Sequence, residues 1–235
     1  MGGGGATRFG CEQPTLFERV AAGTYRHPAG VGGYGVVGVG SRFAVDARPY
    51  RSPKDTGMHF EIYGEQDSDV ETPTTGAWLR FGASSTAQVD VTGTDRVLSL
   101  RLDGRFAEPY GSYDVPMAEL VGAPTLGSDP TRELLRGFRP GRLLGESAVA
   151  VAVEYRWPIW TTADARLETG LGNAFGKHLH DFSTDLLRFS LSGGIEIPFA
   201  SRHRVMILAG FGTETFADGA DPTSARIYVG GTTPL

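Results

Sequence analysis

Nine segments of the chain alternate between apolar and polar side chains, which is the pattern of a β-strand whose two faces meet different environments. In RVLSLRLDGRFA, Leu98, Leu100 and Leu102 fall on one face, and polar residues fall on the other. Most segments reach the ~9–11 residues that a tilted strand needs to cross a bilayer. The predicted strands cover 37–48, 58–64, 76–91, 96–107, 148–157, 163–172, 187–197, 204–216 and 225–235.

The polar faces of these segments carry an unusual share of charge. In AVAVAVEYRW (148–157), the valines, Tyr155 and Trp157 oppose the alanines, Glu154 and Arg156. A face rich in Arg, Glu and Gly suits the interior of a membrane barrel. A soluble β-sandwich or a lipocalin-like barrel, with its apolar face inward, would alternate in the same way.

The connections between the segments favour the membrane barrel, because short turns alternate with long loops, as in outer-membrane barrels. Aromatic residues also lie toward strand ends, where interfacial girdles form; these are Trp78, Tyr155, Trp157 and Trp160. We therefore predict an all-β, transmembrane, antiparallel up-and-down β-barrel of about 8–10 strands, with short periplasmic turns and long extracellular loops. The short turns are 92–95, 158–162 and 199–203, and the long loops are 65–75, 109–143, 175–185 and 217–224.

This prediction divides the chain into an N-terminal segment, 1–31, and an outer-membrane barrel, 32–235, that carries the long loop 109–143. Residues 17–26 could supply a further strand and make the strand count even, as in bacterial barrels. The start, MGGGGATRFG, has neither the charged nor the apolar region of a signal peptide, so we expect an export signal to be missing there.

Composition and charge exclude several other classes of protein. The 34 glycines disfavour a helical fold, and no apolar run is long enough for a transmembrane helix. The net charge of −5 gives no basic footprint for nucleic acid. The single cysteine, Cys11, can form no internal disulfide, and His178 and His180 have no third metal ligand beside them. No nucleophile elbow or metalloprotease motif occurs, so we expect neither an enzyme nor a bound cofactor.

One stretch resembles a known family. The motif Leu135-Arg136-Gly137-Phe138 stands in the long loop, ahead of a strand that ends Glu154-Tyr155-Arg156; the next strand ends LGNAF (171–175). The segment VGVGSRFAVDARPYRSPKDTG also matches, and the likeness runs from about Val36 to the C-terminus. This pattern is similar to the BamA/TamA-type outer-membrane assembly and bacterial surface-antigen superfamily, in its C-terminal barrel region.

The resemblance implies that the long loop folds back into the barrel and that its Arg136 meets lumenal carboxylates. Glu154 matches one family acid, whereas Gly170 stands where the family has its second acid, and Glu168 on the same face could replace it. An arginine in a partly dehydrated lumen needs a carboxylate partner. We therefore expect a loop–barrel lock made of Arg136, Gly137, Phe138, Glu154 and Glu168.

The resemblance also implies a location in the bacterial outer membrane and a role in protein assembly or translocation. The partners would be outer-membrane lipid, with client outer-membrane proteins or another barrel copy. The alternative is a small structural or narrow pore-forming outer-membrane barrel without assembly activity, because a barrel of this size has little free lumen.

Overall fold

The computed structural model describes residues 22, 29–30, 33–49, 54–71, 76–111, 113–125, 133–199 and 203–232, and these residues form an all-β structure. No helix in this part of the chain is long and apolar enough to cross a membrane. Nine strands make the main sheet, in line with the nine predicted segments. They are β1 (Val36–Asp46), β2 (Gly57–Asp69), β3 (Ala77–Asp90), β4 (Val97–Pro109), β7 (Ser147–Trp160), β8 (Ala163–Phe175), β9 (Arg188–Phe199), β10 (His203–Thr215) and β11 (Pro222–Thr232).

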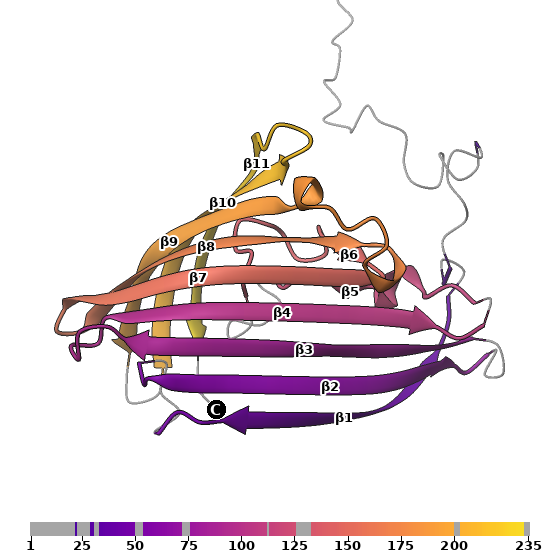
Figure 1. Ribbon diagram of the computed structural model, residues 1–235, viewed down its shortest axis with the longest axis horizontal. Helices are drawn as coiled ribbons and strands as arrows, with labels where there is room; N and C mark the ends of the chain where they lie inside the picture. The colour runs from indigo at the N-terminus through magenta and orange to yellow at the C-terminus, as the bar shows by residue number, and fades with distance from the viewer. Residues whose placement is uncertain are drawn as a thin grey trace, which may run out of the picture.

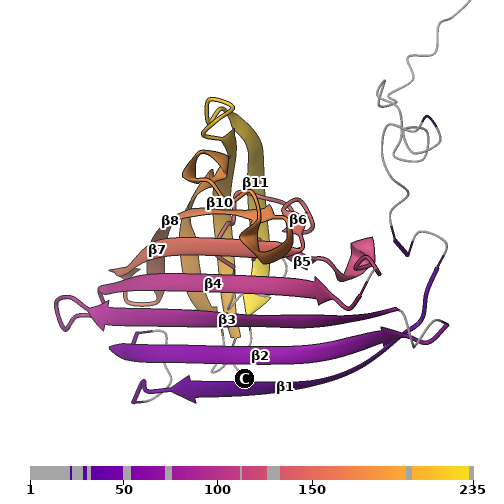
Figure 2. The ribbon, with the colours of Figure 1, turned by 45° about the vertical axis from the view of Figure 1, so that its right-hand side comes forward.

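The nine strands form one antiparallel meander in chain order, interrupted only by the long loop between β4 and β7. In Figure 1, β1–β4 and β7 run across the view, whereas β9, β10 and β11 turn away from that layer, and Figure 2 shows the same strong curvature. The sheet is not closed within the described residues, because β1 pairs only with β2 and β11 pairs only with β10. The loop carries a second, two-stranded sheet of β5 (Val121–Gly122) and β6 (Leu144–Gly145).

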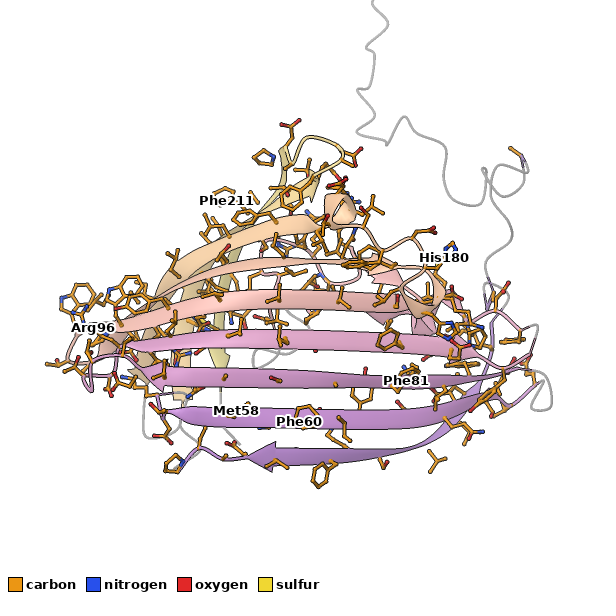
Figure 3. All side chains as sticks on the ribbon, viewed as in Figure 1. Met58, Phe60, Phe81, Arg96, His180 and Phe211 are labelled. Carbon is orange, nitrogen blue, oxygen red and sulfur yellow. The ribbon has the colours of Figure 1, made fainter. Side chains whose placement is uncertain are left out.

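The two faces of the main sheet are inverted relative to a soluble protein. On β4, Leu98, Leu100 and Leu102 are 41 to 47% exposed, whereas Ser99 and Asp103 are buried. On β7, the alanines, Glu154 and Arg156 are buried on the inner, concave face of the sheet. Figure 3 shows Met58, Phe60 and Phe81 projecting from the ribbons of β2 and β3, on the outward face. The structure therefore places polar side chains inside and apolar side chains outside, which a sandwich or lipocalin arrangement would reverse.

The predicted end of one strand is wrong. The turn was expected at 158–162, but β7 continues through Pro158 to Trp160, and the turn is only 161–162. Pairing between β4 and β7 has already ended at Arg156, so the missing N–H of Pro158 interrupts no hydrogen bond on that side. Its pairing with β8 shifts between Pro158 and Trp160, and a bulge of this kind tolerates proline.

Strand β2 is also longer than predicted, because it extends to Asp69, into the segment 65–75 that was expected to be a loop. Its acidic residues stand an even number of positions apart, so their side chains share one face of the strand. Asp67 binds Arg80 of β3, with 2.7 Å between Oδ2 and Nε. The predicted N-terminal segment 1–31, including the candidate strand 17–26, lies almost wholly outside the described residues.

The aromatic residues expected at an interface divide between the two faces of the sheet. Tyr155 and Trp157 stack on the outward face with ring centroids 5.2 Å apart, and Trp160 is 68% exposed. Trp78, in contrast, is fully buried. Its position in β3 puts it on the concave face with Arg80, because side chains two residues apart share a face.

Trp78 stacks on Tyr113, with ring centroids 6.2 Å apart, and meets the edge of Tyr34 at 6.4 Å. The hydroxyl of Tyr34 donates a hydrogen bond of 3.0 Å to Glu119. Burial, together with this hydrogen bond, raises the pKa of Tyr34 to about 12. The cluster therefore belongs to the interior of the sheet and not to its outer rim.

Candidate functional site

The loop between β4 and β7 returns to the concave face and packs against small side chains. Leu134, Leu135 and Phe138 are at most 3% exposed and form one core cluster with the inward alanines of β7. The backbone N–H groups of Leu134 and Leu135 both donate to the carbonyl of Pro124 at 3.0 Å, which fixes the turn. The alternation of alanine with valine along β7 thus leaves room inside for the loop.

Glycines on the barrel wall allow the loop backbone to approach closely. A Cβ atom added at Gly170 would lie 2.6 Å from the carbonyl oxygen of Leu134. At Gly212, an added Cβ would lie 2.6 Å from the ring of Phe138. Gly170 therefore makes space for the loop at the position where the resembling family has its second acid.

Gly137 lies against the β10 backbone, where a Cβ of its own would be 2.0 Å from the carbonyl oxygen of Phe211. Its N–H donates to Ser190 Oγ at 2.9 Å, and its carbonyl accepts a hydrogen bond of 2.5 Å from Ser224 Oγ. Strands β9, β10 and β11 thus all contact this single loop residue. Only glycine fits this approach without displacing the wall.

Arg136 points into a cluster of acids and is 1% exposed. Its Nη1 lies 3.2 Å from Glu154 Oε2 and 3.2 Å from Glu168 Oε2, and the first contact is a hydrogen bond. Its Nε lies 3.5 Å from Glu133 of the same loop. The structure therefore brings together Arg136, Glu154 and Glu168, with Gly137 and Phe138 beside them.

Three more arginines, none of which was expected in the loop–barrel lock, surround Glu154. Arg101 and Arg156 lie 3.2 Å and 3.1 Å from its Oε1, and Arg166 contacts its Oε2. A carboxylate so placed is heavily neutralised, which a buried charge requires. Strand parity already puts all three arginines on polar faces, and that signal could have identified them.

The charges on the concave face follow the register of the strands. Glu154 lies opposite Glu168, and Arg156 lies opposite Arg166 in the next row. Asp164 lies opposite Glu196 in the row after that. Like charges directly opposite are destabilising, so each pair depends on the row of opposite sign beside it.

The row of acids at Asp164 and Glu196 is also joined to other parts of the chain. Arg166 Nη1 lies 3.5 Å from Glu196, within the concave face. Lys54, from the connection between β1 and β2, lies 3.0 Å from Asp164 and 3.1 Å from Asp95. The first connection of the meander therefore reaches across to β8.

The ion pairs of Arg136 attach the loop to the concave face of the sheet.

No group of three His, Cys, Asp or Glu side chains that could hold a metal occurs among the described residues. The two loop histidines have separate carboxylate neighbours: His178 Nε2 lies 2.7 Å from Glu108, and His180 Nδ1 lies 2.8 Å from Asp181.

Comparison with known proteins supports the fold. No family model matches the sequence, and no curated protein matches it. Among solved structures, BamA from Haemophilus ducreyi lacking POTRA domains 1–3 is similar, with a TM-score of 0.60 and 13% sequence identity. The match covers 84% of this chain and 42% of that chain, so this chain spans less than half the length of its structural neighbour. At this identity the likeness concerns the fold alone: the chain has an outer-membrane-barrel kind of fold, similar to that of BamA.

Proposed function

We propose that the chain is the membrane-embedded barrel part of a bacterial outer-membrane protein of the BamA/TamA type, which assists protein assembly or translocation. The loop 133–143 is held inside the sheet by the loop–barrel lock of Arg136, Gly137, Phe138, Glu154 and Glu168. The proposed role requires no chemical reaction and no cofactor. The proposed partners of the chain are outer-membrane lipid and client outer-membrane proteins.

The main support for a membrane location is that the sheet has apolar side chains outside and charged side chains inside. Outward residues such as Leu100 and Ile207 are more than 40% exposed, although they stand in central strands with neighbours on both sides. Exposed apolar side chains in this number and continuity are unfavourable in water and favourable in lipid. The buried charges on the opposite face are those of a polar barrel interior.

The buried attachment of the loop supports the more specific part of the proposal. A loop that only covered a pore would need no fully buried cation. An unpaired buried charge costs roughly several kcal/mol of stability. Here Arg136 meets three acids, and Gly137 contacts the far wall. The loop is thus built into the interior of the barrel.

The direct test is the effect of the chain on a client. The chain is folded into lipid vesicles, and the folding rate of a small, urea-unfolded outer-membrane barrel is measured by heat-modifiable gel mobility. We expect faster folding than in vesicles that carry an unrelated barrel at equal density. Equal rates would reject assembly activity.

The alternative is a narrow pore-forming or structural barrel without assembly activity. Side chains and the loop fill the described part of the concave face, so we expect low conductance, which within this alternative favours the structural role. Planar-bilayer conductance distinguishes the two functions. Stable single-channel currents without any effect on the client would favour the pore, and neither effect would favour a structural role.

A further inference from the structure

An apolar groove lies on the outward face of the sheet, away from the loop–barrel lock. It has a volume of about 820 Å³, within the range of ~300–1,000 Å³ that is typical of small-molecule sites. Side chains of β2, β3, β4, β7 and β8 line it, together with Phe182 and Leu187 of the connection between β8 and β9. Phe60 and Phe81, which belong to its lining, are labelled in Figure 3.

The groove exists because small residues interrupt the outward apolar surface. Ala83 lies directly opposite Gly104 on the neighbouring strand, between Ile62 and Val149 in the same row. On one side of this row, Phe81 and Phe106 stack with ring centroids 5.1 Å apart. A Cβ added at Gly104 would meet nothing closer than the Phe106 ring at 4.0 Å, so the space above it is open.

A lysine and a histidine stand at the end of the groove that carries the long connections. Glu108 follows Phe106 on the outward face, and Lys177 Nζ lies 2.6 Å from its carboxylate, with His178 Nε2 at 2.7 Å. The ammonium of lysine has three donors, so one contact with Glu108 leaves two others. Lys177 and Phe182 belong to the same connection, which joins the charged end to the apolar wall.

Hydrogen bonds attach the connection to the start of β7. Ser147 Oγ donates to the carbonyl of Gly176 at 2.7 Å and accepts from the N–H of Leu179 at 3.2 Å. The N–H of Lys177 donates to Glu146 at 3.1 Å. His178, Leu179 and Asp181 all have positive φ angles, which is uncommon for residues other than glycine. Tertiary contacts thus position this lysine and histidine relative to the groove.

We propose that this groove holds one acyl chain of a membrane phospholipid with a net negative charge, whose phosphate group binds Lys177 and His178. The inference rests on the proposed function, in which the outward face meets lipid. An apolar channel that ends at a lysine ammonium, with an imidazole beside it, fits an amphiphile with an anionic head. A lipid without net charge would fill the same groove without a preference for this end.

The test uses spin-labelled phosphatidylglycerol and phosphatidylcholine, with identical acyl chains, in vesicles that contain the folded chain. The wild type should immobilise more phosphatidylglycerol than phosphatidylcholine. Gly104→Leu fills the groove and should abolish this excess of immobilised phosphatidylglycerol, while the lipid shell around the rest of the outward face stays. Gly64→Leu is the matched control, because Gly64 is also an outward glycine with nothing within 4 Å of an added Cβ, and it lies outside the groove.

The head group has its own variants. Lys177→Gln combined with His178→Gln should remove the preference for phosphatidylglycerol and leave chain immobilisation unchanged. Glu108→Gln removes the competing carboxylate and should raise the preference.

Equal spectra for the Gly104 and Gly64 variants would overturn the proposal, as would a wild-type dimer that only the Gly104 variant dissociates. A wild type that fails to fold into vesicles at all would instead contradict the membrane location itself.

Discussion

The carboxylates of Glu154 and Glu168 face each other across β7 and β8, directly opposite in register and both buried. Arg136 Nη1 lies 3.2 Å from an oxygen of each. Arg101 also contacts both acids, at 3.2 Å and 3.6 Å. A loop residue thus neutralises a pair of acids that the barrel wall brings together.

Removal of Arg136 should therefore destabilise the structure, and its coupling should be stronger to Glu168 than to Glu154. Glu154 keeps ion pairs with Arg101, Arg156 and Arg166, whereas among the described residues Glu168 keeps an ion pair with Arg101 and a longer-range attraction to Arg166. Double-mutant cycles of Arg136→Ala with Glu168→Gln and with Glu154→Gln measure this difference. Coupling of contacting residues is usually about 0.5–3 kcal/mol.

The readout for both cycles is the temperature at which gel mobility changes to that of the unfolded chain. Arg136→Ala alone should lower this temperature more than Arg136→Ala combined with Glu168→Gln, because a buried carboxylate without its cation is costly. Strictly additive effects in both cycles would show that Arg136 does not interact with the wall.

Gly137→Ala should detach the loop from β10, since the added Cβ would lie 2.0 Å from a backbone oxygen. The loss of stability should be about 1–3 kcal/mol, which is the usual cost of a steric conflict in a packed site. Limited proteolysis of the folded chain should reveal new cleavage within 133–143. Gly104→Ala is the control, because its Cβ enters open space, and equal behaviour of the two variants would contradict the close approach.

Charge on the outward face should be far more harmful than charge on the inward face. Leu100→Arg should cost about 2–4 kcal/mol if the residue is at the bilayer midplane. Ser84→Arg adds the same side chain on the concave face, directly opposite Asp103, and should cost much less. The measurement is folding yield and denaturant stability in lipid vesicles. Equal penalties would indicate that the outward face does not contact lipid.

The connections that follow β2, β4, β8 and β10 should all face the cell exterior, because they lie at one end of the sheet. In a Cys11→Ser background, a cysteine at Asp218 or Ser183 should react with a membrane-impermeant maleimide on intact cells. A cysteine at Thr94 should react only after the outer membrane is permeabilised. The opposite pattern would reverse the orientation, because strands β3–β4 and β10–β11 are joined at opposite ends of the sheet.

Local alternation was sufficient to predict the number of strands and the division of their faces. In β4 and β7 the period-two pattern is continuous, so the positions of Leu100 and Glu154 follow from it directly. The end of β7 could not be predicted in this way. Whether Pro158 ends a strand depends on where β4 stops pairing, which is a property of two distant segments.

In the candidate site, too, the sequence pattern predicted which face a residue occupies but not which residues it contacts. Parity placed Glu154 and Glu168 on a polar face, and the family resemblance drew attention to Arg136. Parity also puts Arg101, Arg156 and Arg166 on polar faces, but their contacts with Glu154 depend on the cross-strand register, which parity does not give. Trp78 was misplaced because its position near a strand end suggested an interface, while its parity and its contacts with Tyr34 and Tyr113 put it inside.

The meander has a consequence for how the sheet is completed. Because successive strands reverse direction, the first and ninth strands, β1 and β11, run the same way. Direct pairing of these two edges would be parallel, and an antiparallel ring of strands needs an even number of members. Any further β-segments that bridge the edges with antiparallel hydrogen bonds at both seams must therefore be odd in number. A single bridging strand would run opposite to both β1 and β11, which fixes its direction before its sequence is known.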